Sequence, residues 1–121
     1  MSTKVEEIYN LLKEKKLSLA VTKVNILRKK TPKDIAILLA WCEVAQRIRK
    51  LQQTIPTLMQ ELENFSQPFQ KALICERLSR ACMINKQDAP LSALWISKAF
   101  RYLTFDLQNY KFPSLKREKS I

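Results

Sequence analysis

The 121-residue chain contains no glycine. Glycine adopts positive φ at no steric cost, so the tight turns of β-hairpins and the strained loops of many active sites depend on it. The chain is instead rich in Leu, Ile, Ala, Lys, Glu and Gln, most of which favour helix. The missing glycine and this composition together predict an all-α fold.

Apolar residues recur at three- and four-residue spacing along most of the chain, which indicates amphipathic helices. Prolines mark several boundaries because the residue before a proline avoids the helical region. Pro56 falls in the first turn of its predicted helix, where proline is tolerated. We expect a turn over 85–88 and six helices, over 3–16, 18–30, 33 or 34 to 48, 54 to about 64, 68–83 and 90 to about 110.

This length suits one domain, and we expect a single helical domain over 1–112 and a short, basic, flexible tail over 113–121. The first ten residues lack the apolar core of a signal peptide, and no apolar run reaches the roughly 18 residues of a membrane span. A soluble, cytoplasmic protein is therefore expected. The sixth helix is expected to cap the core through Trp95, Phe100, Leu103 and Phe105.

An internal repeat distinguishes stacked hairpins from a closed bundle. The segment over 17–32 resembles the second half of a tetratricopeptide repeat. The residues at the matching spacing are Leu17, Ala20, Val24, Leu27 and Pro32. A small residue at the Ala20 position lets two helices approach closely, and proline ends the pair.

Two further units continue this resemblance. About 34 residues on, Leu38, Trp41, Cys42 and Ala45 fall at the family's first-helix positions. A third unit follows from Leu78, but it needs one extra residue in its turn. The resemblance covers roughly residues 1–104 as three degenerate repeats and implies antiparallel hairpins stacked as a short α-solenoid. An unrelated antiparallel bundle is the alternative.

In this family the first helix of each pair lines a concave surface. The resemblance therefore implies a groove that holds an amphipathic helix of another protein in a hetero-oligomeric complex. In size and repeat count the chain is similar to the small tetratricopeptide chaperones of type III secretion, which sequester an aggregation-prone needle subunit. The implied groove residues are Val5, Tyr9, Leu12, Leu39, Glu43, Gln46, Glu76, Arg80 and Met83.

A strong positive charge supports a second hypothesis. Lys and Arg number 22 against 11 Asp and Glu, a formal net charge of +11, and such an excess favours acidic partners. A basic helical protein that binds RNA or DNA through phosphate contacts is therefore the alternative function. The other interpretation is a solvated surface. The candidate basic patch is Lys13, Lys15, Lys16, Lys23, Arg28, Lys29, Lys30 and Lys33.

Catalysis has little support in the sequence. The chain has no histidine for proton transfer near neutral pH and no glycine-rich loop to hold phosphate. The three cysteines lie in apolar helical stretches and form no CxxC motif, which favours buried reduced thiols over a zinc site. We expect no enzyme activity, no metal site and no cofactor.

Overall fold

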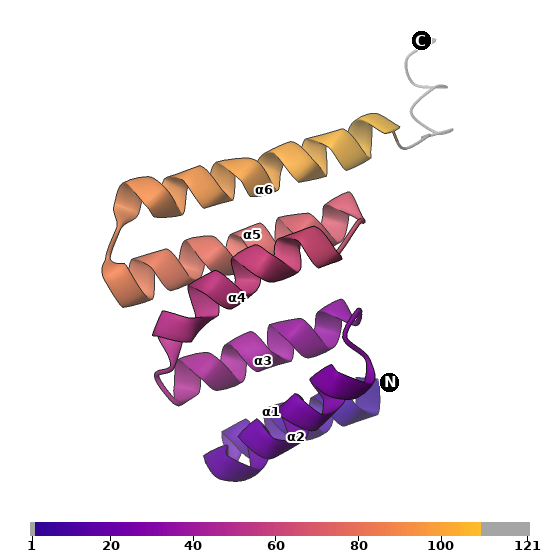
Figure 1. The fold of residues 1–121 in the computed structure, drawn as a ribbon, viewed down its shortest axis with the longest axis vertical. Helices are drawn as coiled ribbons and strands as arrows, with labels where there is room; N and C mark the ends of the chain where they lie inside the picture. The colour runs from indigo at the N-terminus through magenta and orange to yellow at the C-terminus, as the bar shows by residue number, and fades with distance from the viewer. Residues whose placement is uncertain (1, 110–121) are drawn as a thin grey trace, which may run out of the picture.

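The computed structural model describes the backbone of residues 2–109, so the tail predicted over 113–121 lies outside the described residues. Figure 1 shows helices throughout this part of the chain. The all-α prediction is confirmed, and residues 2–109 contain no strand. The helices are α1 (Ser2–Lys13), α2 (Leu17–Lys30), α3 (Ile35–Arg47), α4 (Leu51–Asn64), α5 (Pro68–Ala81), the π-helical turn η1 (Cys82–Lys86) and α6 (Ala89–Asn109).

The helices form three antiparallel hairpins stacked in chain order, with α1 and α2 at one end and α6 at the other (Figure 1). Within each hairpin the two helices pack together, as α1 with α2, α3 with α4 and α5 with α6. The first helix of a hairpin also packs on both helices of the preceding one: α3 lies against α1 and α2, and α5 lies against α3 and α4. This arrangement is the predicted stack of helical hairpins.

The turn inside each hairpin contains one non-glycine residue with positive φ. These residues are Lys15 (φ 63°), Arg49 (φ 62°) and Gln87 (φ 52°). Arg49 follows Lys15 by 34 positions, which matches the repeat length inferred from the sequence. The left-handed region therefore occurs at equivalent turns of a chain that has no glycine to place there.

The third hairpin differs in the way α5 ends. The helix continues through η1 to Lys86 before Gln87 turns the chain. The turn predicted over 85–88 is therefore wrong at its first two residues. A π-helical turn holds more residues than an α-helical one because its hydrogen bonds span five residues instead of four. Gln87 follows Arg49 by 38 positions, so the third hairpin turn comes later than a 34-residue spacing would place it.

The core consists of two clusters of buried side chains, and Trp41 packs against both. One cluster joins α1, α2 and α3 and includes Ala20, which is fully buried. The other joins α3 to α6 and includes Cys42, Cys75 and Cys82. The buried Ser79 and Ser92 hydroxyls form a 2.7 Å hydrogen bond between α5 and α6. The small, fully buried side chain of Ala20 agrees with the close approach of two helices that the repeat resemblance implies at this position.

The start of α4 differs from the prediction. The helix begins at Leu51 and includes Pro56, so Pro56 does not lie in its first turn. At this sixth position of the helix, proline cannot donate to the carbonyl four residues earlier, and its ring crowds that carbonyl. The Thr54 hydroxyl donates to the Lys50 carbonyl at 3.2 Å, at the start of the same helix.

The predicted capping role of α6 is confirmed in part. Trp95 is buried and Leu103 is partly buried against the core. Phe100 is 63% exposed, so its assignment to the core is wrong. The side chain of Phe105 lies outside the described residues.

Candidate partner-binding groove

The first helices of the three hairpins, α1, α3 and α5, are neighbours in the order α1, α3, α5. Leu12 is the one member of the predicted groove that the structure removes from the surface. Its side chain is 2% exposed and packs with Ile8 in the core, because α2 and α3 cover that side of α1. The other eight residues are at least partly accessible, namely Val5, Tyr9, Leu39, Glu43, Gln46, Glu76, Arg80 and Met83.

Four charged side chains join α3 to α5 in this region. The Arg77 Nη1 donates to Glu43 Oε2 at 2.5 Å, and both side chains are mostly buried. Arg80 donates to Glu76 Oε2 from Nη2 at 2.8 Å, and its Nη1 lies 3.7 Å from Glu43 Oε2. Arg77 Nε lies 3.8 Å from Glu76 Oε1. We call these four residues the charge network; its two positive and two negative charges balance.

Arg77 is held in its charged form by the charge network. Burial by itself lowers the pKa of the Arg77 guanidinium, but the hydrogen bond and the charge of Glu43 outweigh it and raise the pKa overall. The reason is that a nearby carboxylate stabilises the cation more than partial desolvation disfavours it. Arg77 and Glu43 therefore form a fixed ionic contact between two hairpins.

Tyr9 on α1 is partly exposed, and charges of the network influence its phenol. Its side chain is 38% exposed, and partial burial raises the pKa of its phenol. The charges of Arg77 and Glu43 act on this group in opposite directions, Arg77 lowering and Glu43 raising its pKa. The phenol of Tyr9 is therefore influenced by two charges of the network, and α1, which carries it, packs beside α3.

Arg77 is the functional candidate that the predicted groove set lacks. Glu43 and Arg77 lie 34 residues apart, at equivalent distances along two successive repeats. The sequence could have indicated this pair, because Glu43 and Arg77 carry opposite charges one repeat apart. Adjacent first helices place such positions side by side.

Apolar side chains are exposed beside the charge network. Met83 and Ile84 are 46% and 45% exposed at η1, where α5 ends. Leu39 is partly exposed on α3. Large apolar residues next to paired charges are the surface composition that an amphipathic helix contacts in groove recognition.

The predicted basic patch does not form one surface. Lys13, Lys15 and Lys16 lie at the α1–α2 turn, whereas Arg28 to Lys33 lie at the other end of α2. A 14-residue helix is about 21 Å long, and it separates the two groups. Lys23 lies on α2 between the two groups and pairs with Glu7 at 2.6 Å.

Several of these cations already have partners. Arg28 Nη2 lies 2.9 Å from Glu61 Oε2, and its guanidinium stacks 4.7 Å from the centre of the Trp41 ring. Lys33 donates to the Asn64 carbonyl at 3.1 Å. Lys16 pairs with Glu14 at 3.3 Å, at exposed positions. These contacts reduce the positive charge available to a phosphate backbone.

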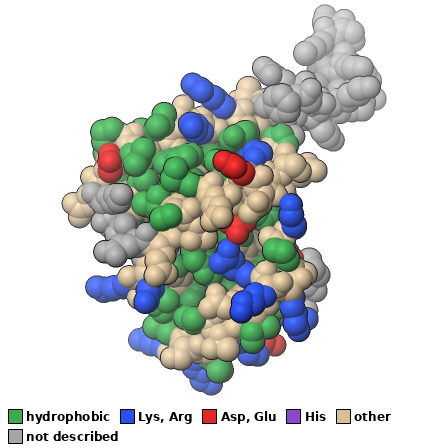
Figure 2. Space-filling model, in the orientation of Figure 1, with side chains coloured by type: hydrophobic (Ala, Val, Ile, Leu, Met, Phe, Trp, Pro, Cys, Tyr) green, Lys and Arg blue, Asp and Glu red, His purple; other side chains and the backbone are tan. Residues whose placement is uncertain are grey.

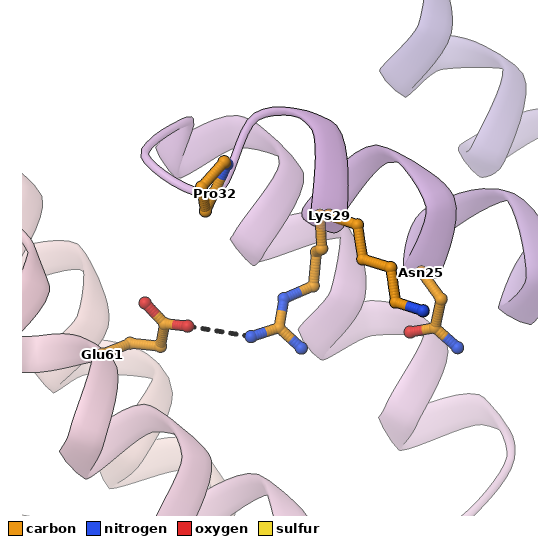
Figure 3. Close-up of a pocket in the computed structure, with 5 residues that line it drawn as sticks. Asn25, Lys29, Pro32 and Glu61 are labelled. Carbon is orange, nitrogen blue, oxygen red and sulfur yellow. Dashed lines mark hydrogen bonds and ion pairs between the residues drawn. The ribbon is translucent and has the colours of Figure 1, made fainter.

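A pocket of about 400 Å³ lies between α2 and α4, next to Pro32 (Figure 3). Figure 3 shows Lys29 and Asn25 side by side on α2 and Glu61 on the opposite helix, joined by the ion pair to Arg28. The Glu61 carboxylate neutralises the positive charge of Arg28 in the wall of this pocket. An anion would therefore meet a carboxylate at the same place as the guanidinium.

Cys42 and Cys75 are not activated nucleophiles. Burial raises the pKa of Cys42 to about 12 and also raises the pKa of Cys75. These thiols stay protonated at neutral pH, and only the thiolate is strongly nucleophilic. Within the described part of the chain, no three His, Cys, Asp or Glu side chains are grouped as a metal site would require.

None of the described helices has the length and apolar character needed to span a bilayer. The chain matches no family model, and no curated protein or solved structure matches it.

Proposed function

We propose that this protein is a non-catalytic interaction module, an adaptor or chaperone that holds an amphipathic helical segment of another protein. The observation that supports this function best is the composition of the α1–α3–α5 face. Tyr9, Leu39 and Met83 come from three hairpins and are all accessible, with the charge network between them. A partner helix would bury its apolar side chains on these residues and align its polar ones with the network.

The charge network would select the orientation of the partner helix more than its affinity. Arg80 and Glu76 are each more than a third exposed, so partner charges can compete for them at little cost. Arg77 and Glu43 are mostly buried and would keep their mutual contact. We therefore assign Arg80 and Glu76 to partner recognition and Arg77 and Glu43 to holding the groove in shape.

The narrower assignment remains part of this proposal: a tetratricopeptide-like protein similar to the small type III secretion chaperones, acting in the cytoplasm as one subunit of a hetero-oligomer. Three hairpins with 34-residue spacing between the first two turns support the repeat. Three buried cysteines support a reducing compartment, because exported proteins commonly form disulfides.

The test begins with purification of the tagged full chain from its native host after nuclease treatment, followed by identification of the proteins that remain bound. The triple variant Tyr9→Ser, Leu39→Ser, Met83→Ser should lose the partner and keep its helical circular dichroism. A matched control replaces Leu19, Ile26 and Met59 with serine, since these side chains are about half exposed and lie on the second helices α2 and α4. Equal loss of binding in both variants would contradict a groove on the first helices.

The net charge of +11 supports nucleic acid as the second candidate partner. The salt dependence of the binding affinity distinguishes the two functions. Affinity for an apolar helix should change little between about 50 and about 200 mM salt, since burial is insensitive to screening. Binding to a phosphate backbone should fall steeply over the same range, and substituting Lys29 and Lys30 with alanine should reduce the salt slope by about one unit per lost contact.

A further inference from the structure

The α1–α2 turn and the α3–α4 turn carry the same pattern of positive charge. Each cation of the first turn has a counterpart 34 positions later in the second turn, and all of these side chains are exposed. We call them the turn cations: Lys13, Lys15 and Lys16, then Arg47, Arg49 and Lys50. Two successive hairpins therefore present the same set of cations.

The two turns lie on the same side of the stack. In Figure 1 each hairpin turns on the left, whereas α1 begins and α6 ends on the right. The helix α1 packs beside α3, and Lys50 lines a pocket of about 220 Å³ together with Val21 and Asn25 of α2. Figure 2 shows Lys and Arg side chains along the lower left of the molecule, which is the side of these two turns. The turn cations therefore form one surface.

Few acidic groups offset the turn cations. Glu14 is the one carboxylate within 13–16 and 47–50, and it pairs with Lys16 at 3.3 Å. Among the described residues, none of the other five turn cations has an ion pair. Arg28, by contrast, is held by Glu61 at the other end of α2. The positive charge at the two turns is therefore free to attract a partner.

Helix stability does not account for most of these cations. Lys13 and Arg47 suit the last turns of α1 and α3, where the helix dipole favours positive charge. Lys16 and Lys50 are the N-caps of α2 and α4, where the dipole disfavours a cation, and neither side chain makes a capping hydrogen bond. The residue before each N-cap has a left-handed φ, which favours glycine. Local stability would therefore place other residues at two positions in each turn.

The density of this charge suits a nucleic-acid duplex. The helices α1 and α3 are packed neighbours, and packed helices lie about 8–10 Å apart. A duplex carries one negative charge per about 1.7 Å of its axis, or about six charges over about 10 Å, as many as there are turn cations. An extended acidic peptide carries at most one charge per about 3.3 Å. The turn cations therefore match a duplex more closely than an acidic peptide.

We propose that the turn cations form a second binding surface, which contacts the phosphate backbone of a nucleic-acid duplex without reading its sequence. Exposed Lys and Arg side chains bind phosphates through charge and hydrogen bonds and need no contact with the bases. The surface lies at the turns and not on the α1–α3–α5 face, so this function goes beyond the proposed groove and does not require it. It also lies at the opposite end of α2 from Lys29 and Lys30.

The probe is a fluorescein-labelled DNA duplex of about 20 base pairs with an arbitrary sequence, and fluorescence anisotropy measures its binding to the full chain. Neutralising two cations of either turn should weaken binding at least about tenfold at about 50 mM salt and reduce the salt slope by about two units. The two variants are Lys13→Gln with Lys15→Gln, and Arg47→Gln with Arg49→Gln. A parent chain that does not bind the duplex at about 50 mM salt would overturn the proposal.

The control variant Lys4→Gln, Arg101→Gln removes the same charge from exposed positions on α1 and α6 outside the two turns, and it should bind normally. Equal weakening in the control would show that net charge alone attracts the duplex. Weakening in the variant Lys29→Ala, Lys30→Ala, with the turn variants unchanged, would place the duplex at the other end of α2. Either result would overturn a surface formed by the turns.

Two competitors distinguish other acidic partners. Polyglutamate and vesicles containing phosphatidylserine are each compared with unlabelled duplex at equal concentrations of negative charge. The duplex should displace the labelled probe at least about tenfold more effectively than either competitor. Equal or better displacement by polyglutamate would assign the surface to an acidic protein, and the same result with vesicles would assign it to a membrane. Both outcomes would overturn the duplex as the partner.

A separate variant tests the argument from helix stability. Replacing Lys16 and Lys50 with serine supplies a preferred N-cap residue to α2 and α4 and removes two turn cations. The melting temperature should rise by about 2 °C or more, while the affinity for the duplex falls at least about tenfold. A lower melting temperature would show that these lysines stabilise the turns, and it would contradict their assignment to a ligand.

Discussion

Arg77 of α5 and Glu43 of α3 form an ion pair between neighbouring hairpins, with 2.5 Å between Nη1 and Oε2 and side-chain exposures of 15% and 21%. The two residues are one repeat apart in sequence. Because α3 and α5 are both first helices of their hairpins, this pair fixes the separation of two walls of the proposed groove. It connects the stability of the stack directly to the geometry of the site.

Breaking this ion pair should destabilise the fold. In a double-mutant cycle with Arg77→Met and Glu43→Gln, we expect a coupling free energy of about 1–2 kcal/mol, because the pair is largely shielded from water. Urea denaturation followed by circular dichroism measures it. The exposed Lys16–Glu14 pair is the control and should show no measurable coupling. Equal coupling in both pairs would contradict the structural role of burial.

Enlarging the side chain at position 20 should also destabilise the protein. Ala20 is fully buried where α2 meets α1 and α3, so Ala20→Leu should cost about 1–3 kcal/mol through overpacking. Ala93→Leu, at an exposed position on α6, is the matched control and should leave the urea midpoint unchanged. A neutral Ala20→Leu would indicate that the helices do not cross closely at this residue.

Glycine at the left-handed turn positions should stabilise the fold. Lys15 and Arg49 have φ near +60°, where a side chain clashes with its own backbone. Lys15→Gly and Arg49→Gly should each raise the free energy of unfolding by about 0.5–1 kcal/mol, with part of the relief lost to the greater entropy of the unfolded chain. Thermal denaturation measures the gain. Glu6→Gly, at an exposed position inside α1, should instead destabilise.

Alkaline pH should destabilise the protein in part through Cys42. An exposed thiol in the unfolded chain releases its proton near pH 9, whereas the folded protein holds it until a pKa of about 12. The folded state therefore binds more protons between these values, and the free energy of unfolding falls as the pH rises through this window.

The variant Cys42→Ala should lose about 1 kcal/mol less stability than the parent between about pH 8 and about pH 10. Urea titrations at both pH values give the difference. Parallel pH profiles for the two proteins would show that the thiol of Cys42 ionises at similar pH in the folded and unfolded chains. The comparison concerns the pH profile, so the general loss of packing in the alanine variant does not affect it.

Sequence patterns predicted the helices well where turn residues or apolar spacing were clear. Pro32 and Pro68 mark real boundaries, and Asp34 caps α3 by accepting a hydrogen bond from the Ala36 amide at 2.9 Å. Pro56 was misleading because proline is favoured at a helix start, whereas here it is the sixth residue of α4, where it costs one backbone hydrogen bond. Helical periodicity alone cannot separate these positions. The π-helical turn at Cys82–Lys86 was missed for a similar reason, since its residues have ordinary helical composition.

The groove was less predictable than the helices. Leu12 has the same spacing from Val5 and Tyr9 that a groove residue would have, yet α2 and α3 bury it. Tertiary neighbours decide which edge of an apolar stripe faces solvent, and one sequence does not record them. The exposed position of Phe100 was missed for the same reason. A large aromatic residue on an amphipathic helix is ordinarily core, and only the open end of the stack leaves it accessible.

The stacking order has a thermodynamic consequence. No helix of the first hairpin packs on α5 or α6 in the described chain. The folding of one end of the stack is therefore coupled to that of the other end only through the middle hairpin. Such a molecule behaves as a short one-dimensional chain of nearest-neighbour units, in which the terminal units open independently. A ligand spanning α1, α3 and α5 would turn three separately opening units into one cooperative unit. Amide hydrogen exchange, graded along the stack in the unbound protein, should then become uniform.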